Sequence, residues 1–318
     1  MNTFITLLKR EYWENRAGFL WTPIIVAAVF LVLTLGALVL GSFGDSGGLT
    51  FNNIKFSAVL SNLGPEELAD LGLGLDRTLA AVWALLQVAL YFVVLFYLLA
   101  ALFDERRDRS VLFWKSLPVS DTLTVLAKAA TALLVAPLMA WAVSVAAGLV
   151  FLVGLSAYVL AFGLSPMTAV WGPGAPVEVF AATLLSVPLS AVWALPMVGW
   201  MLLCSAFVAN RPFWWAIGVP ALTGLMLTWL GVLNVFRGAA EFYWPQLFLR
   251  LVAGVVPGSW MWFDSQASID FDVTKDGAWS LLVQSAWALM ANPSTWIGVV
   301  AGAILIWAAI MARRRRSE

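Results

Sequence analysis

Long apolar runs separated by short polar segments dominate the sequence. A helix needs about 20 mainly apolar residues to cross the hydrocarbon core of a bilayer. Stretches of at least this length that contain no Asp, Glu, Lys or Arg occupy residues 17–44, 78–103, 129–177, 179–210, 212–236 and 277–312. The pattern predicts an all-α integral membrane protein.

The two longest apolar stretches carry internal breaks. In 129–177, Ser165-Pro166 and the Gly-Pro-Gly-Ala-Pro segment at 172–176 indicate a loop, so one helix that ends near Gly163 is expected. In 277–312, Asn292-Pro293 suits an N-cap followed by the first helical residue. Residues 278–291 are then too short to cross and are expected to form a re-entrant or interfacial helix, with 247–256 as its candidate partner.

These breaks give one transmembrane domain over residues 1–318 with six spans. The spans are expected at about 19–41, 79–103, 122–162, 179–209, 213–236 and 293–312, and the outer loops at 45–77, 165–178 and 237–291. A cleaved signal peptide is disfavoured because its apolar core is only about 7–15 residues long.

The distribution of basic residues sets the expected orientation. With both termini in the cytoplasm, the inner segments hold thirteen of the 18 Lys and Arg residues, including the run Arg313–Arg316. Cytoplasmic loops are enriched in these residues. We therefore expect a multi-pass protein of a bacterial cytoplasmic (inner) membrane with both termini cytoplasmic.

Composition excludes several classes of protein. The chain is 62% hydrophobic and 11% charged with zero formal net charge, which argues against a nucleic-acid partner. It has no histidine and a single cysteine, Cys204, so histidine catalysis, histidine metal sites and an intrachain disulfide are excluded. No catalytic residue and no metal site is expected. No lysine lies in a P-loop pattern, so any ATP must bind to another chain.

Segment 3–16, just before the first span, has the pattern of an amphipathic helix. Apolar and charged residues fall on opposite faces, and Arg10 and Glu14 are spaced for an i,i+4 ion pair. Such a helix lies in the membrane interface. The residues expected to contact lipid there are Lys9, Arg10, Tyr12 and Trp13.

The segment between the second and third spans is charged and then locally apolar. Charged residues run from Asp104 to Arg109, and an apolar stretch follows at 111–114. An exposed Phe113-Trp114 pair suits a protein-docking site, since aromatic residues are enriched at interface hot spots. The same pair also suits an anchor at the headgroup level. Both interpretations remain open on composition.

Few polar residues lie inside the spans, and none of the expected buried carboxylates of an ion-coupled transporter is present. Gln87 and Tyr91 are four residues apart on one helix face, and Asn234 lies late in the fifth span. They could line a pathway or form hydrogen bonds between helices, and the second role is the more common.

Two stretches resemble the ABC-2 type permease family, the membrane subunits of many ATP-binding-cassette exporters. The segment from Leu7-Leu8-Lys9-Arg10-Glu11 to Arg16 is similar to the family's elbow helix. The segment from Asp104 to Lys128, with Leu117-Pro118-Val119-Ser120, is similar to its cytoplasmic coupling helix. At Asp108-Arg109-Ser110 many members have a glycine beside a threonine, which leaves the subfamily open.

The resemblance implies partners as well as a fold. Two permease subunits, identical or related, would pair with two copies of a separate ATPase that binds ATP and Mg. The coupling residues would be Glu105, Arg106, Arg107, Arg109, Phe113 and Trp114. The re-entrant segment would shape the outer gate, and Gln87, Tyr91 and Asn234 would line the pathway.

Together these features predict a non-catalytic exporter subunit whose substrate is unidentified. One alternative is a membrane anchor or scaffold subunit, which needs only spans and a docking loop. A second alternative, a lipid-modifying enzyme, lacks a cluster of polar catalytic groups in the sequence.

Overall fold

The computed structural model is almost entirely helical. It describes residues 3–42, 50–51, 54–55, 64–108, 119–236, 238–256, 259 and 277–315. Six of its helical segments are long and apolar enough to cross a membrane. The prediction of a helical multi-pass membrane protein is therefore confirmed.

The first half of the chain supplies three of these segments. Helix α1 and the π-helical turn η1 lead into α2, and α7 and the π-helical turn η2 lead into α8. The bounds are α1 Thr3–Glu14, η1 Ala17–Trp21, α2 Thr22–Ser42, α4 Pro65–Ala101, α5 Phe103–Arg107, α7 Asp121–Ala130, η2 Thr131–Val135 and α8 Ala136–Ala161. Two short strands, β1 (Thr50–Phe51) and β2 (Ile54–Lys55), pair antiparallel between α2 and α4.

The second half supplies the other three. The bounds are η3 Met167–Trp171, α9 Pro176–Phe207, η4 Trp214–Gly218, α10 Val219–Val232, α11 Ala239–Tyr243, η5 Trp244–Leu249, α12 Arg250–Ala253, α14 Ala278–Ala291 and α15 Pro293–Arg315. As expected, 278–291 is a separate short helix, and Pro293 opens the last span.

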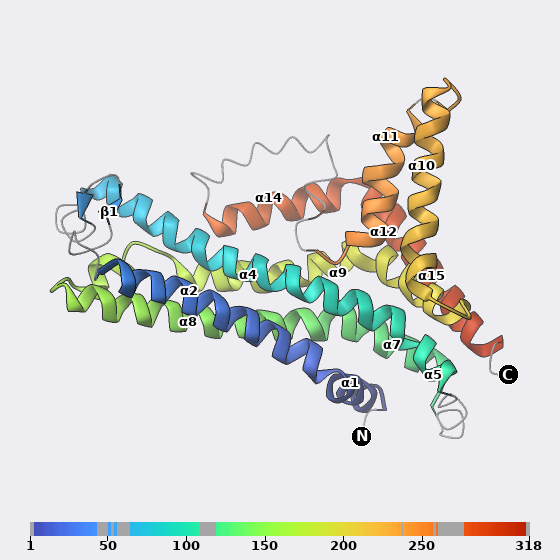
Figure 1. Ribbon diagram of the computed structural model, residues 1–318, viewed down its shortest axis with the longest axis horizontal. Helices are drawn as coiled ribbons and strands as arrows, with labels where there is room; N and C mark the ends of the chain where they lie inside the picture. Colours follow the sequence, from blue (N-terminus) through green and yellow to red (C-terminus); the bar gives the residue numbers. More distant parts are fainter. Residues whose placement is uncertain are drawn as a thin grey trace.

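The helices form a long bundle with one diverging arm. Helices α2, α4 and α8 lie side by side, whereas α10 rises away from them with α11 (Figure 1). Both chain termini and α5 lie at the same end of the bundle (Figure 1), which we call the terminal end. An even number of spans accounts for this arrangement.

The main core lies around α9, which packs against α4 and α15. Leu98, Met197, Met201 and Leu202 are fully buried there. A Cβ added to Gly199 would lie 2.7 Å from the carbonyl oxygen of Gly302, and one added to Gly302 would lie 2.6 Å from the carbonyl carbon of Leu195. Small residues allow membrane helices this close approach.

The second span differs from its predicted bounds. Helix α4 begins at Pro65, inside the segment expected as an outer loop at 45–77. Pro65 occupies the first helical position, and the Gly64 N–H donates to the Glu67 carboxylate at 2.8 Å. The charged residues at 66–77 limit the part that lipid can cover, but they do not end the helix.

Candidate functional site

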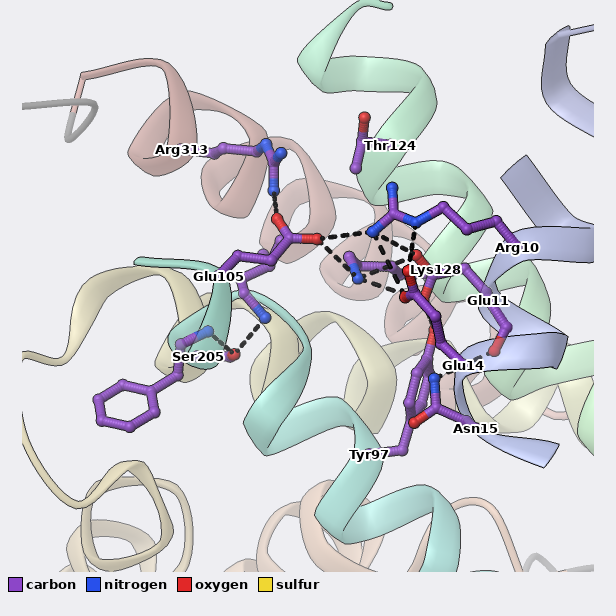
Figure 2. Close-up of polar contacts among 12 residues, drawn as sticks. Arg10, Glu11, Glu14, Asn15, Tyr97, Glu105, Thr124, Lys128, Ser205 and Arg313 are labelled. Atoms are coloured by element: carbon purple, nitrogen blue, oxygen red, sulfur yellow. Dashed lines mark hydrogen bonds and ion pairs between the residues drawn. The ribbon is translucent and has the colours of Figure 1, made fainter. Parts of the chain in front are cut away.

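Six charged side chains from four helical segments gather inside the terminal end of the bundle. This charged cluster consists of Arg10 and Glu11 on α1, Glu105 on α5, Asp121 and Lys128 on α7, and Arg313 on α15. Figure 2 shows most of these side chains converging from separate helices. Three carboxylates and three cations balance one another.

The Lys128 ammonium links two carboxylates at the centre of the cluster. Its Nζ lies 3.0 Å from Glu11 Oε1 and 3.1 Å from Glu105 Oε1. The Tyr97 hydroxyl on α4 donates to Glu11 Oε2 at 2.8 Å. Glu11 and Lys128 are only 1% and 3% exposed. Each charge is paired, as a buried ionised group must be.

Arg313 extends the cluster to the last span. Its Nη1 lies 2.5 Å from Glu105 Oε2, and its Nε lies 2.9 Å from Asp121 Oδ1. Arg10 Nη2 lies 3.4 Å from Glu105 Oε1, so Glu105 contacts three cations. Removing one partner of a buried ion pair leaves an uncompensated charge. The cluster therefore fixes α1, α5, α7 and α15 against one another.

Helix α5 is also attached to the end of α9. Arg106 Nη2 donates to the carbonyl oxygens of Ser205 and Val208 at 2.7 and 2.8 Å. Ser205 Oγ accepts from the backbone N–H groups of Leu102 and Phe103, both at 2.9 Å. These bonds satisfy backbone groups at the end of α9 and at the break between α4 and α5.

An open cavity of about 360 Å³ lies beside the charged cluster. Side chains from α1, α4, α5 and α7 line it, including Glu11, Glu14, Tyr97, Asp104 and Lys128. In the part of the chain that the structure describes, no group of three or more His, Cys, Asp or Glu residues could hold a metal ion. The cavity is polar and gives access to the cluster.

The residues expected to couple to an ATPase occupy different positions. Glu105 belongs to the charged cluster, and Arg106 is bonded to α9. Arg107 is exposed and pairs with Asp104 and Asp108 at 3.3 and 3.1 Å. The remaining three, Arg109, Phe113 and Trp114, lie outside the described residues.

The expected lipid-contact residues of α1 also separate into two groups. Lys9 and Trp13 are exposed and Tyr12 is half-buried, which is compatible with lipid contact. Arg10 instead points into the cluster, where it also pairs with Glu14 at 2.8 Å. The i,i+4 pair expected from the sequence is present.

Sequence reasoning missed Glu11, Asp121 as an ion-pair partner, and Arg313. The available signal was local: Glu11 follows Leu7 by one helical turn, and these are the two buried residues of α1. Lys128 was the other signal, since it is a lone cation beside the long apolar stretch of the third span. Only the fold shows that the two side chains meet.

The three possible pathway residues are not brought together. Gln87 is 2% exposed, its Nε2 has no hydrogen-bond partner among the described residues, and Tyr91 is half-buried on the same helix. Asn234 is exposed beyond the end of α10 with a φ of 60°, on the arm that diverges from α4 (Figure 1). A role in a pathway remains a prediction.

Comparisons of the chain with protein-family models, with curated proteins and with solved structures find no match.

Proposed function

We propose that this chain is the membrane-spanning permease subunit of an ABC-2 type exporter. A separate ATPase, present in two copies, binds ATP and Mg, and a second permease subunit, identical or related, completes the assembly. The chain performs no bond chemistry; it converts movement of the ATPase into movement of its spans. We place it in a bacterial cytoplasmic membrane with both termini in the cytoplasm.

The charged cluster is the observation that supports this proposal best. The segment between α5 and α7 has cluster residues on both sides, Glu105 before it and Asp121 and Lys128 after it. A displacement of this segment by a docked ATPase would act through paired charges on α1 and α15. Packed side chains and ion-pair networks can carry coupling between distant sites.

The same segment carries the expected docking residues. Phe113 and Trp114 lie in the interval between the two anchored ends, where they suit insertion into a groove of the ATPase. Glu105, Arg106 and Arg107 would then transmit the movement from the near side, and Arg10 and the elbow helix α1 would respond through Glu105.

Co-purification with the ATPase tests the proposal. The membrane-extracted wild-type chain is expected to retain a stoichiometric ATPase, whereas Phe113→Ala/Trp114→Ala loses it while still inserting and folding. The second Phe-Trp pair of the chain provides a matched control. Phe213 and Trp214 are 39% and 65% exposed at the start of the fifth span, and Phe213→Ala/Trp214→Ala is expected to keep the ATPase.

The results separate the competing functions. An ATPase retained by the Phe113/Trp114 variant with normal coupled activity contradicts the docking assignment. A wild-type chain that retains other proteins but no ATPase supports the scaffold alternative. In proteoliposomes, ATP hydrolysis that depends on the permease would distinguish a transporter from a passive anchor.

A further inference from the structure

Arg250, the first residue of α12, is a buried cation that does not belong to the charged cluster. Only 6% of it is exposed. Within the described residues no Asp or Glu forms an ion pair with it. A buried charge without a counter-ion is costly in a membrane protein and marks a candidate functional site.

The guanidinium is held in place by neutral groups. It lies over the Trp193 ring of α9, 3.8 Å from the ring centroid. Its Nη1 donates to the Ser294 carbonyl oxygen at 2.6 Å, and its Nη2 to that of Thr295 at 3.3 Å. A Cβ at Gly298 would collide with the same group. These contacts fix its position, but none of them, within the described residues, carries a negative charge.

Among the described residues, several hydrogen-bonding groups of Arg250 and of the residues that contact it have no partner. They are buried and belong to three segments that meet at Arg250, and the atoms concerned are Arg250 Nε, Trp193 Nε1, Ser294 Oγ and Thr295 Oγ1. Buried polar atoms are nearly always hydrogen-bonded. All four can donate, although the two hydroxyls can also accept. Because the guanidinium is positively charged, an acceptor with negative charge would match this set of groups.

The position in the fold also favours an anion. Ser294 and Thr295 belong to the first turn of α15, and the N-terminal end of a helix carries partial positive charge. Trp296 and Trp287 nearby in the sequence are 53% and 73% exposed. Indole rings prefer the headgroup level of a membrane. We therefore expect the site to lie at the headgroup level, where phosphate groups are abundant.

We propose that Arg250, Trp193, Ser294 and Thr295 form a binding site for a phosphate group, carried by a membrane lipid or free at the membrane surface. Nη1 and Nη2 of Arg250 already donate to backbone carbonyl oxygens, so its Nε–H is the guanidinium donor left for a phosphate oxygen, and the hydroxyl and indole donors complete the acceptor's coordination. This site is independent of the exporter proposal, because binding requires neither the ATPase nor transport.

Native mass spectrometry and thermal unfolding of the purified chain test the site. The chain is placed in neutral detergent with phosphatidylglycerol, phosphatidylcholine or inorganic phosphate. We expect phosphatidylglycerol to be retained and to raise the unfolding temperature more than phosphatidylcholine does. Arg250→Gln is expected to weaken this binding about tenfold or more, since a charge-assisted hydrogen bond is lost. Arg77→Gln, an exposed arginine on α4, is the matched control and is expected to bind normally.

A second variant covers the case in which Arg250→Gln does not fold. Trp193→Phe/Thr295→Ala removes two donors that have no partner in the unliganded protein, so it is expected to fold normally and still bind phosphatidylglycerol several-fold more weakly.

The lipid and phosphate arms identify the source of the group. An equal response to inorganic phosphate, lost in Arg250→Gln, identifies the free anion as the ligand. Wild-type binding without preference for phosphatidylglycerol or phosphate, or an unchanged preference in both variants, overturns the proposal.

Discussion

Lys128 is the residue on which the charged cluster depends most, because its ammonium contacts both Glu11 and Glu105. Those carboxylates come from different helices and are buried. If the ammonium is removed, the Glu11 carboxylate retains, among the described residues, the Tyr97 hydroxyl and the more distant Arg10 as polar partners. The cluster is therefore stabilising only as a complete set, as is general for buried polar networks.

We predict that Lys128→Met lowers the free energy of unfolding by about 3–5 kcal/mol, because it removes the closest counter-ion of buried Glu11 and one of the three cations that contact Glu105. Denaturant unfolding in detergent measures this. Glu11→Gln/Lys128→Met is expected to lose less than Lys128→Met alone, since the uncompensated charge is removed with its partner.

An exposed pair provides the control. Arg107 pairs with Asp104 and Asp108 at the surface, where ion pairs contribute little. Arg107→Gln should therefore unfold like the wild type. A Lys128→Met protein with wild-type stability would show that the cluster is not structurally important.

Among the helices, α9 and α15 pack closely against each other at glycine residues. Gly199 and Gly302 face the opposite helix so closely that each Cβ would contact its backbone. The same two helices carry Trp193 and the Ser294–Thr295 turn, which hold Arg250, and α15 ends at Arg313 in the charged cluster. The spacing of this helix pair thus sets the geometry of both sites.

We predict that Gly302→Ala destabilises the protein by about 1–3 kcal/mol, because the added methyl group overpacks the interface. Gly36→Ala in α2 is the matched control, since nothing lies within 4 Å of its added Cβ. Thermal unfolding of the two variants is compared. Equal unfolding temperatures would contradict the close approach of α9 and α15.

In the molecule as a whole, the two chain termini lie at one end of the bundle (Figure 1). Six spans require this arrangement if each crosses the membrane once. The charged cluster, the polar cavity and α5 lie at the same end, so a partner bound there would act on all of them.

Cysteine labelling tests this topology. Lys9→Cys and Arg315→Cys are expected to react with an impermeant maleimide from one side of the membrane, and Thr168→Cys from the other; all three positions are exposed. The unmodified chain is the blank, because Cys204, its single cysteine, is buried. Labelling of Lys9→Cys and Arg315→Cys from opposite sides would contradict an even number of spans.

The sequence was sufficient for the spans but less so for their ends. The start of α15 at Pro293 and the separate helix at 278–291 were predicted, because an N-cap and a proline are local signals. The start of α4 at Pro65 was placed about 14 residues too late, because charged residues were taken to end the helix as well as the apolar segment. Capping by Glu67 decides that boundary.

By itself the sequence determined that this protein is solvated by lipid, since apolar length is a local and additive property of the chain. Only the tertiary structure decided which charges meet. Glu11 and Lys128 are 117 residues apart, and Glu105 and Arg313 are 208 apart. The attraction between charges depends on distance through space, so no local pattern could pair them, nor place Arg250 over Trp193.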